Sequence, residues 1–114
     1  MDILPIINKT YEIYKTTVEI NSKLEKRWRF DFGKGLENSV LEYLEILIMA
    51  KNAPKTMKVG YLLKAVAKLE IIVLKYRLLL EFKLVNETRL FQIQSKLAEI
   101  GRMLGGWLKA VQSL

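Results

Sequence analysis

The sequence predicts an all-α fold, an antiparallel up-down four-helix bundle in which residues 1–114 form a single domain. Apolar residues recur at helical spacing through four segments, and short breaks separate these segments. No segment alternates β-branched with polar residues as a strand does, and neither Asn-Gly nor Asp-Gly occurs. With 114 residues, 51% of them hydrophobic, the chain is long enough for one buried core but too short for two.

The first helix is expected over about residues 5–26, because Pro5 suits the first turn of a helix. Its apolar positions fall in two adjacent strips, which together predict a wide buried face: Ile7, Tyr11, Tyr14 and Val18 in one and Ile6, Ile13 and Ile20 in the other. The second helix is expected over about residues 33–51, with Asp31 as a candidate cap. Its inward face would be Leu36, Val40, Tyr43, Leu44 and Leu47.

The third helix, expected over about residues 57–84, is the longest. Pro54 interrupts the chain before it, and Thr56 can cap its start. This helix carries two separate apolar faces, Ala65, Leu69, Ile72, Val73, Tyr76 and Leu80 on one and Leu63, Ala67, Leu74 and Leu78 with Ile71 at the edge on the other. An ordinary surface helix has one such face. The third helix is therefore either central in its own domain or shared with a neighbouring subunit.

The fourth helix is expected over about residues 87–113, with Asn86 as its cap. The connection before it is very short, so the third and fourth helices should pack antiparallel. Apolar residues then alternate in steps of three and four, a seam typical of four-helix bundles: Leu90, Ile93, Leu97, Ile100, Leu104, Trp107 and Val111.

The formal net charge is +7, which favours polyanionic partners or anionic surfaces. Residues 51–83 carry a net charge of +6, whereas residues 31–50 carry −3. Lys64, Lys68 and Lys75 share one stripe of the third helix. This stripe is either a solvated face or a surface that neutralises a phosphate backbone.

A second basic patch precedes the second helix. Arg27 and Arg29 flank Trp28 there. An aromatic ring among cations can stack on a base. Trp28 could equally pack against the end of the bundle.

Small residues line one side of the fourth helix. Ala98, Gly101 and Gly105 leave a smooth strip where another helix could approach closely, from the same chain or from another subunit. Together with the second apolar face of the third helix, Leu63, Ala67, Leu74 and Leu78, this strip leads us to expect a closed cyclic homo-oligomer.

Catalysis is not expected, and no catalytic residue, metal site or cofactor is assigned. Without histidine or cysteine, the chain lacks imidazole bases, thiol nucleophiles and the Glu-x-x-His ligands of di-iron bundles. Glu42 and Glu45 lie three residues apart and could share a metal ion, but the sequence offers no further ligand for it. Charges interrupt every apolar run, so no membrane span is expected. The absence of cysteine and of a signal-peptide pattern leads us to expect a cytoplasmic protein.

The segment Ile-Gly-Arg-Met-Leu-Gly-Gly-Trp-Leu-Lys, residues 100–109, resembles the C-terminal signature of a family of four-helix bundles. This family is related to the accessory variability determinant of diversity-generating retroelements, and its superfamily includes proteins encoded in intervening sequences of 23S ribosomal RNA genes. Weaker similarities lie at Phe32-Gly33 with Leu36 and at residues 74–79.

The resemblance implies a strongly basic homopentamer that binds RNA or DNA and a retroelement reverse transcriptase. It also implies a nucleic-acid contact at Arg77, where the family tends to place a basic residue. The sequence departs from the family pattern at Gly35, where we expect a polar or basic residue, and in its preference for lysine over arginine. The alternative is a scaffolding oligomer of the ribosomal RNA intervening-sequence type.

Overall fold

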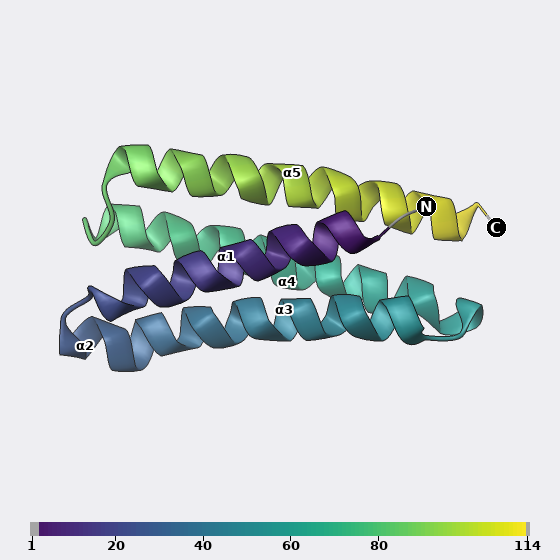
Figure 1. Cartoon of the computed structure of the whole chain (residues 1–114), viewed down its shortest axis with the longest axis horizontal. Coiled ribbons are helices and arrows are strands. Elements are labelled where there is room, and N and C mark those ends of the chain that lie inside the picture. The colour runs from purple at the N-terminus through teal and green to yellow at the C-terminus, as the bar shows by residue number, and fades with distance from the viewer. Residues whose placement is uncertain (1–2, 114) are drawn as a thin grey trace.

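The computed structural model describes residues 3–113 and is an all-α bundle of 47 × 24 × 19 Å, without strands in that range (Figure 1). The four long helices are α1 (Leu4–Ser22), α3 (Lys34–Asn52), α4 (Lys55–Glu81) and α5 (Glu87–Gln112). A short helix, α2 (Lys26–Trp28), and a π-helical turn, η1 (Arg29–Gly33), lead into α3. The predicted all-α fold with four long helices is confirmed.

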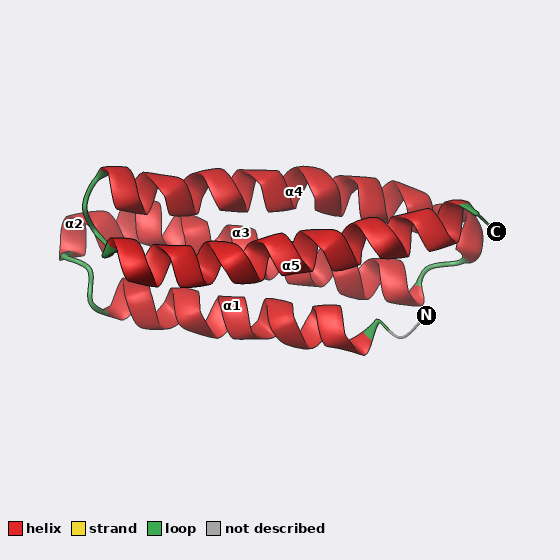
Figure 2. Cartoon of the chain, turned by 90° about the horizontal axis from the view of Figure 1, so that it is seen from above, coloured by secondary structure: helices red, strands yellow, loops and turns green. Residues whose placement is uncertain are grey.

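The helices run alternately up and down, and each packs against two neighbours. α3 and α5 both contact α1 and α4, whereas α1 and α4 lie diagonally opposite each other (Figures 1 and 2). α2 and the α4–α5 connection lie together at one end of the bundle, and the described ends of the chain lie at the other. No helix in the described part of the chain has a stretch long and apolar enough to cross a membrane.

The core follows the predicted periodicity in three of the four long helices. The α5 seam is buried from Leu90 to Trp107, with Val111 half-buried. On α4 the first apolar face points inward, joined by Leu62 and Leu79, which the sequence analysis missed. On α3 the predicted inward residues are buried, except for half-buried Leu44.

In α1 the expected wide buried face, made of both apolar strips, is wrong in part. The strip of Ile6, Ile13 and Ile20 is buried, but Tyr11 is 54% exposed and Val18 is 40% exposed. The intervening core positions belong instead to two threonines, Thr10 and Thr17. The Thr17 hydroxyl donates a hydrogen bond to the Ile13 carbonyl oxygen at 2.7 Å and also pairs with the hydroxyl of Tyr76 on α4. These bonds allow a polar side chain to occupy the core.

The first connection also differs from the prediction. α1 ends at Ser22 rather than near Lys26, and Asp31 lies inside η1 instead of capping a helix. The buried amide of Asn21 donates hydrogen bonds to the Gly33 carbonyl oxygen at 2.6 Å and to Glu37 Oε2 at 2.7 Å. These two bonds tie the end of α1 to the start of α3, so the chain turns earlier than its apolar pattern suggests.

The ends of α4 are shifted as well. The helix begins at Lys55 after Pro54, so Thr56 is not its cap. It ends at Glu81, three residues before the predicted end, because Lys83 adopts a left-handed conformation with φ of 57°. The Leu84 amide then donates to the Leu79 carbonyl oxygen at 2.8 Å, which closes a Schellman motif. Asn86 caps α5 as predicted, since its Oδ1 accepts a hydrogen bond from the Arg89 amide.

Candidate nucleic-acid interface

The predicted lysine stripe lies on the side of α4 that borders α3. Lys68 Nζ forms an ion pair with Glu42 Oε2 at 2.7 Å, and Lys75 Nζ donates a hydrogen bond to Ser39 Oγ at 2.7 Å. Lys64 is exposed and has no ion pair among the described residues. The stripe is therefore a row of three cations of which two already hold partners on α3.

The ion pair between Lys68 and Glu42 changes the electrostatics of the stripe. The hydrogen bond from Lys68, and then its charge, lower the pKa of the Glu42 carboxyl. The stripe lacks interleaved acids along α4, but α3 supplies one from outside. Surface ion pairs of this kind contribute about 0–1 kcal/mol, so a phosphate group can compete with Glu42 for Lys68.

Arg77 lies on the other charged stripe of α4, where its Nε is 3.2 Å from Glu81 Oε1. The side chain is well exposed, and the pair joins residues one helical turn apart. Arg77 is not brought together with the lysines that border α3. As a phosphate ligand it would act separately from them.

The second basic patch forms a cluster of cations and aromatic rings around α2 and η1. The Arg27 guanidinium lies 5.0 Å from the centre of the Trp28 ring, and Trp28 packs against Phe82 with ring centroids 5.2 Å apart. Trp28 is half-buried against the core, so it packs against the end of the bundle. Lys26 Nζ and the Arg29 guanidinium lie 5.8 and 5.4 Å from the centre of the Phe30 ring.

Phe30 was not singled out by the sequence analysis, although it ends the same basic and aromatic run. It is 61% exposed, unlike Trp28. The spacing of these two aromatic residues did not indicate which would be buried. Trp28 is the one that packs inward because it contacts Phe82, the residue that directly follows α4 and is far away in the sequence.

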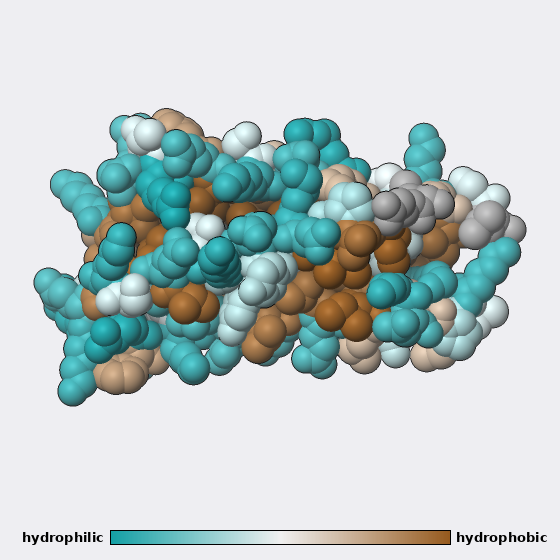
Figure 3. All heavy atoms as spheres, in the orientation of Figure 1, coloured by the Kyte–Doolittle hydropathy of each residue, from teal (hydrophilic) through white to brown (hydrophobic). Residues whose placement is uncertain are grey.

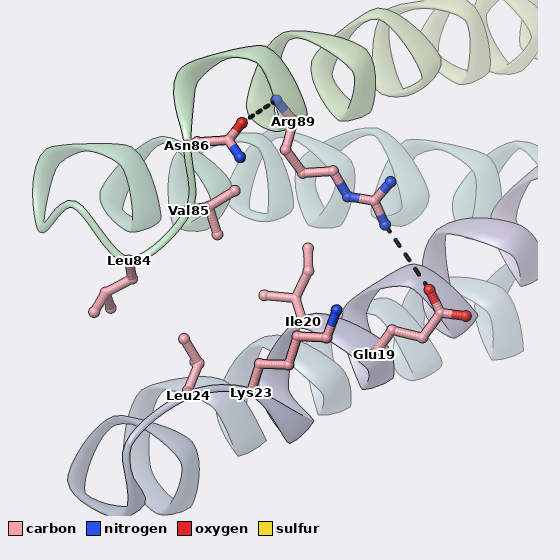
Figure 4. Close-up of a pocket in the computed structure, with 8 residues that line it drawn as sticks. All are labelled: Glu19, Ile20, Lys23, Leu24, Leu84, Val85, Asn86 and Arg89. Atoms are coloured by element: carbon pink, nitrogen blue, oxygen red, sulfur yellow. Dashed lines mark hydrogen bonds and ion pairs between the residues drawn. The ribbon is translucent and has the colours of Figure 1, made fainter.

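A pocket of mixed character lies at the same end of the bundle, between the end of α1 and the α4–α5 connection (Figure 4). Leu84 and Val85 face Ile20 and Leu24 across it, and Lys23 stands at its edge. The Arg89 guanidinium and the Glu19 carboxylate partly neutralise each other over a distance of 3.8 Å. Lys23 has no ion-pair partner among the described residues, so the pocket keeps a net charge of +1.

The second apolar face of α4 lies largely on the surface. Leu63 and Leu74 are each 52% exposed, Ala67 and Ile71 are exposed, and Leu78 is half-buried. A groove runs along each side of this face. The groove next to α3 is half charged, since the lining comprises Ile46, Met49, Ala67 and Ile71 together with Glu42, Glu45, Lys64 and Lys68. The groove next to α5 is mostly apolar, lined by Leu69, Val73, Leu74, Leu97, Ala98 and Gly101 with Glu70 and Gln94. Hence α4 is not enclosed within its own chain.

Figure 3 views the molecule from the side of α1, opposite α4. Hydrophilic atoms cover much of this face, and hydrophobic atoms gather in the half nearer the ends of the chain. Apolar surface is therefore present on the α1 side as well as on α4.

Of the small residues of α5, Ala98 and Gly101 line the groove next to α4, and neither Gly101 nor Gly105 makes a tight contact inside the chain. A Cβ added at Gly101 would meet Leu69 Cδ2 at 3.6 Å, an ordinary contact, and one added at Gly105 would meet nothing within 4 Å. Neither glycine is needed for packing within the chain. Of the two expected explanations, close approach by a helix of the same chain does not apply.

No group of three acidic, histidine or cysteine residues that could hold a metal ion occurs among residues 3–113. The model of a family described as bAvd-like matches residues 4–111, from the start of α1 almost to the end of α5. None of the curated proteins matches the chain.

Proposed function

We propose that this chain, which belongs to the bAvd-like family, is a non-enzymatic protein that binds nucleic acid and associates with the reverse transcriptase of a diversity-generating retroelement. Proteins of this family are of an accessory kind. The observation that carries the proposal is the match over residues 4–111, which includes all but the last residue of α5.

Charge supports the nucleic-acid part of the proposal. The net charge of +7 attracts phosphate, and Lys64, Lys26 and Arg29 are cations without ion-pair partners among the described residues. Lys68 and Lys75 can add contacts if they release Glu42 and Ser39. Lysine binds phosphate as a flexible point charge, so binding should depend little on base sequence.

Self-association is the second part of the proposal. We infer a ring-shaped homo-oligomer, a pentamer by resemblance to the accessory proteins, in which the exposed apolar face of α4 packs against a neighbouring subunit. The exposed Leu63 and Leu74 support this assembly, because the mostly apolar groove between this face and α5 suits contact with another helix. The groove on the α3 side carries Lys64 and Lys68 and is left to the nucleic acid. Several copies would repeat the cations around one ring and increase binding to a long strand by avidity.

The alternative function is a structural oligomer that does not bind nucleic acid. One observation favours it: Glu42 neutralises Lys68 in the middle of the stripe. The same apolar face of α4 would serve such a scaffold equally well.

Salt dependence separates these two functions. Purified protein would be titrated into labelled single-stranded RNA and DNA between about 50 and 200 mM salt, where a protein that contacts several phosphates loses affinity steeply. Absence of binding to either strand at about 50 mM salt would favour the scaffold. Co-purification with a reverse transcriptase encoded beside the gene would test the partner separately.

A further inference from the structure

We infer that the exposed ring of Phe30 stacks on a base of single-stranded nucleic acid while Lys26 and Arg29 contact its phosphates. This inference rests on the proposed nucleic-acid binding. It adds that the ligand is single-stranded and that Phe30 contacts one of its bases.

The geometry around Phe30 carries the inference. The residue is 61% exposed and lies in the turn η1, at the end of the bundle. Two cations, Lys26 Nζ at 5.8 Å and the Arg29 guanidinium at 5.4 Å, lie over its ring, and neither has an ion-pair partner within residues 3–113. A nucleotide offers the two matching groups, an aromatic face and an adjacent phosphate.

The other aromatic rings of this end are less suited to stacking. Trp28 is half-buried and contacts Phe82, and the Arg27 guanidinium lies over the Trp28 ring. A base would have to displace packing that belongs to the fold. At Phe30 it would displace only two cation–π contacts on an exposed ring, each of which is weak compared with base stacking. The released cations can then move to the phosphates.

Single-stranded nucleic acid fits this site better than a duplex. In a duplex each base is already stacked between its neighbours, so its face is not open to a side chain. Stacking on a phenylalanine is also tolerant of sequence, because every base has an aromatic face. Phe30 would therefore add affinity without adding strong sequence preference.

The test compares two oligonucleotides of equal length and equal phosphate number, one carrying bases and one abasic. The parent protein should bind the base-bearing strand about 5- to 150-fold more tightly, the range expected for one stacked base. Phe30→Ala should abolish this preference and leave the affinity for the abasic strand unchanged within about twofold. Phe30→Trp should retain the preference.

Phe91→Ala is the matched control, because Phe91 is also 61% exposed and no lysine or arginine lies over its ring among the described residues. It should retain the preference. Equal affinity of the parent for both strands, or a preference that survives in Phe30→Ala, would overturn the inference and leave the proposed function standing. If the parent binds neither strand at about 50 mM salt, both fail.

Discussion

The side chain of Asn21 contacts the backbone of Gly33 so closely that a larger residue there would force Asn21 to move. Asn21 Nδ2 donates to the Gly33 carbonyl oxygen at 2.6 Å, and a Cβ added at Gly33 would lie 2.8 Å from Asn21 Oδ1. Asn21 is itself buried, so it has little room to move. This contact joins the end of α1 to the π-helical turn before α3.

Gly33→Ala should therefore destabilise the protein. We expect the free energy of unfolding to fall by about 1–3 kcal/mol, the usual cost of overpacking a filled site. Gly60→Ala is the control, because a Cβ there meets nothing within 4 Å and Gly60 lies inside α4. It should raise the free energy of unfolding by up to about 1 kcal/mol. Urea unfolding measures the free energy of unfolding of both variants. Equal values for the two would show that a Cβ at position 33 does not clash with Asn21.

Tyr76→Phe should destabilise the protein at neutral pH. Thr17 already donates to the Ile13 carbonyl oxygen, so the Tyr76 hydroxyl is the donor in the contact with Thr17. Its loss leaves a buried oxygen with one partner fewer, at a cost of about 0.5–1.5 kcal/mol. Chemical unfolding at pH 7 would measure this change.

The same pair gives a pH prediction. Burial raises the pKa of the Tyr76 hydroxyl to about 12, from an ordinary value of 10.0. In the unfolded chain Tyr76 loses its proton at lower pH, so its contribution to stability is present below pH 10 and is lost as pH rises to about 12. The stability gap between the parent and Tyr76→Phe should therefore shrink between these two values. A stability gap that stays constant over this range would show that the pKa of Tyr76 is not raised in the folded protein.

Helical periodicity predicted the fold because it is a property of local sequence. The seam from Leu90 to Trp107 is buried throughout, as its spacing indicates. The error in α1 has a chemical cause: hydrophobicity assigns apolar residues to the core and overlooks Thr10 and Thr17. Thr17 donates its hydrogen locally to Ile13, but the second contact of its hydroxyl is with Tyr76, which lies 59 residues further along the chain.

The candidate site was less predictable, because its properties depend on neighbouring helices. A helical wheel of α4 places Lys64, Lys68 and Lys75 together but contains no information about α3. Glu42, which pairs with Lys68, lies 26 residues away in the sequence. The two charged groups meet only because α3 packs alongside α4.

Lys64→Ala should weaken nucleic-acid binding more than Lys68→Ala does. Lys64 has no ion pair to give up among the described residues, whereas Lys68 must release Glu42 to bind a phosphate. Each lost phosphate contact should reduce the slope of log affinity against log salt by about 1. Affinities measured at several salt concentrations would show whether the slope falls by this amount for Lys64→Ala and by less for Lys68→Ala. Equal effects would show that the ion pair with Glu42 does not matter.

Glu42→Gln should strengthen binding to the same strands. The substitution removes the negative charge beside Lys68 but keeps the shape of the side chain, so Lys68 becomes available to phosphate. Glu12→Gln is the control, because it changes the net charge equally but lies on α1, diagonally opposite α4. A gain in affinity common to both variants would point to net charge rather than to the stripe.

The exposed face of α4 should be where subunits meet. The double variant Leu63→Glu with Leu74→Glu places two charges on this face and should dissociate the oligomer into monomers of 13.3 kDa. Helicity should be unchanged, since both side chains are 52% exposed within the chain. Light scattering coupled to gel filtration measures the mass, and circular dichroism measures the helicity.

Tyr11→Glu is the matched control for that experiment, because Tyr11 is 54% exposed but lies on α1. It should leave the mass of the oligomer unchanged. Gly105→Leu adds a second test, since Gly105 is exposed and a Cβ there meets nothing within 4 Å in its own chain. A Gly105→Leu protein that is fully folded but monomeric would place α5 at the interface beside α4. If the parent protein has a mass of 13.3 kDa at every concentration, it is a monomer, and the proposed assembly is refuted.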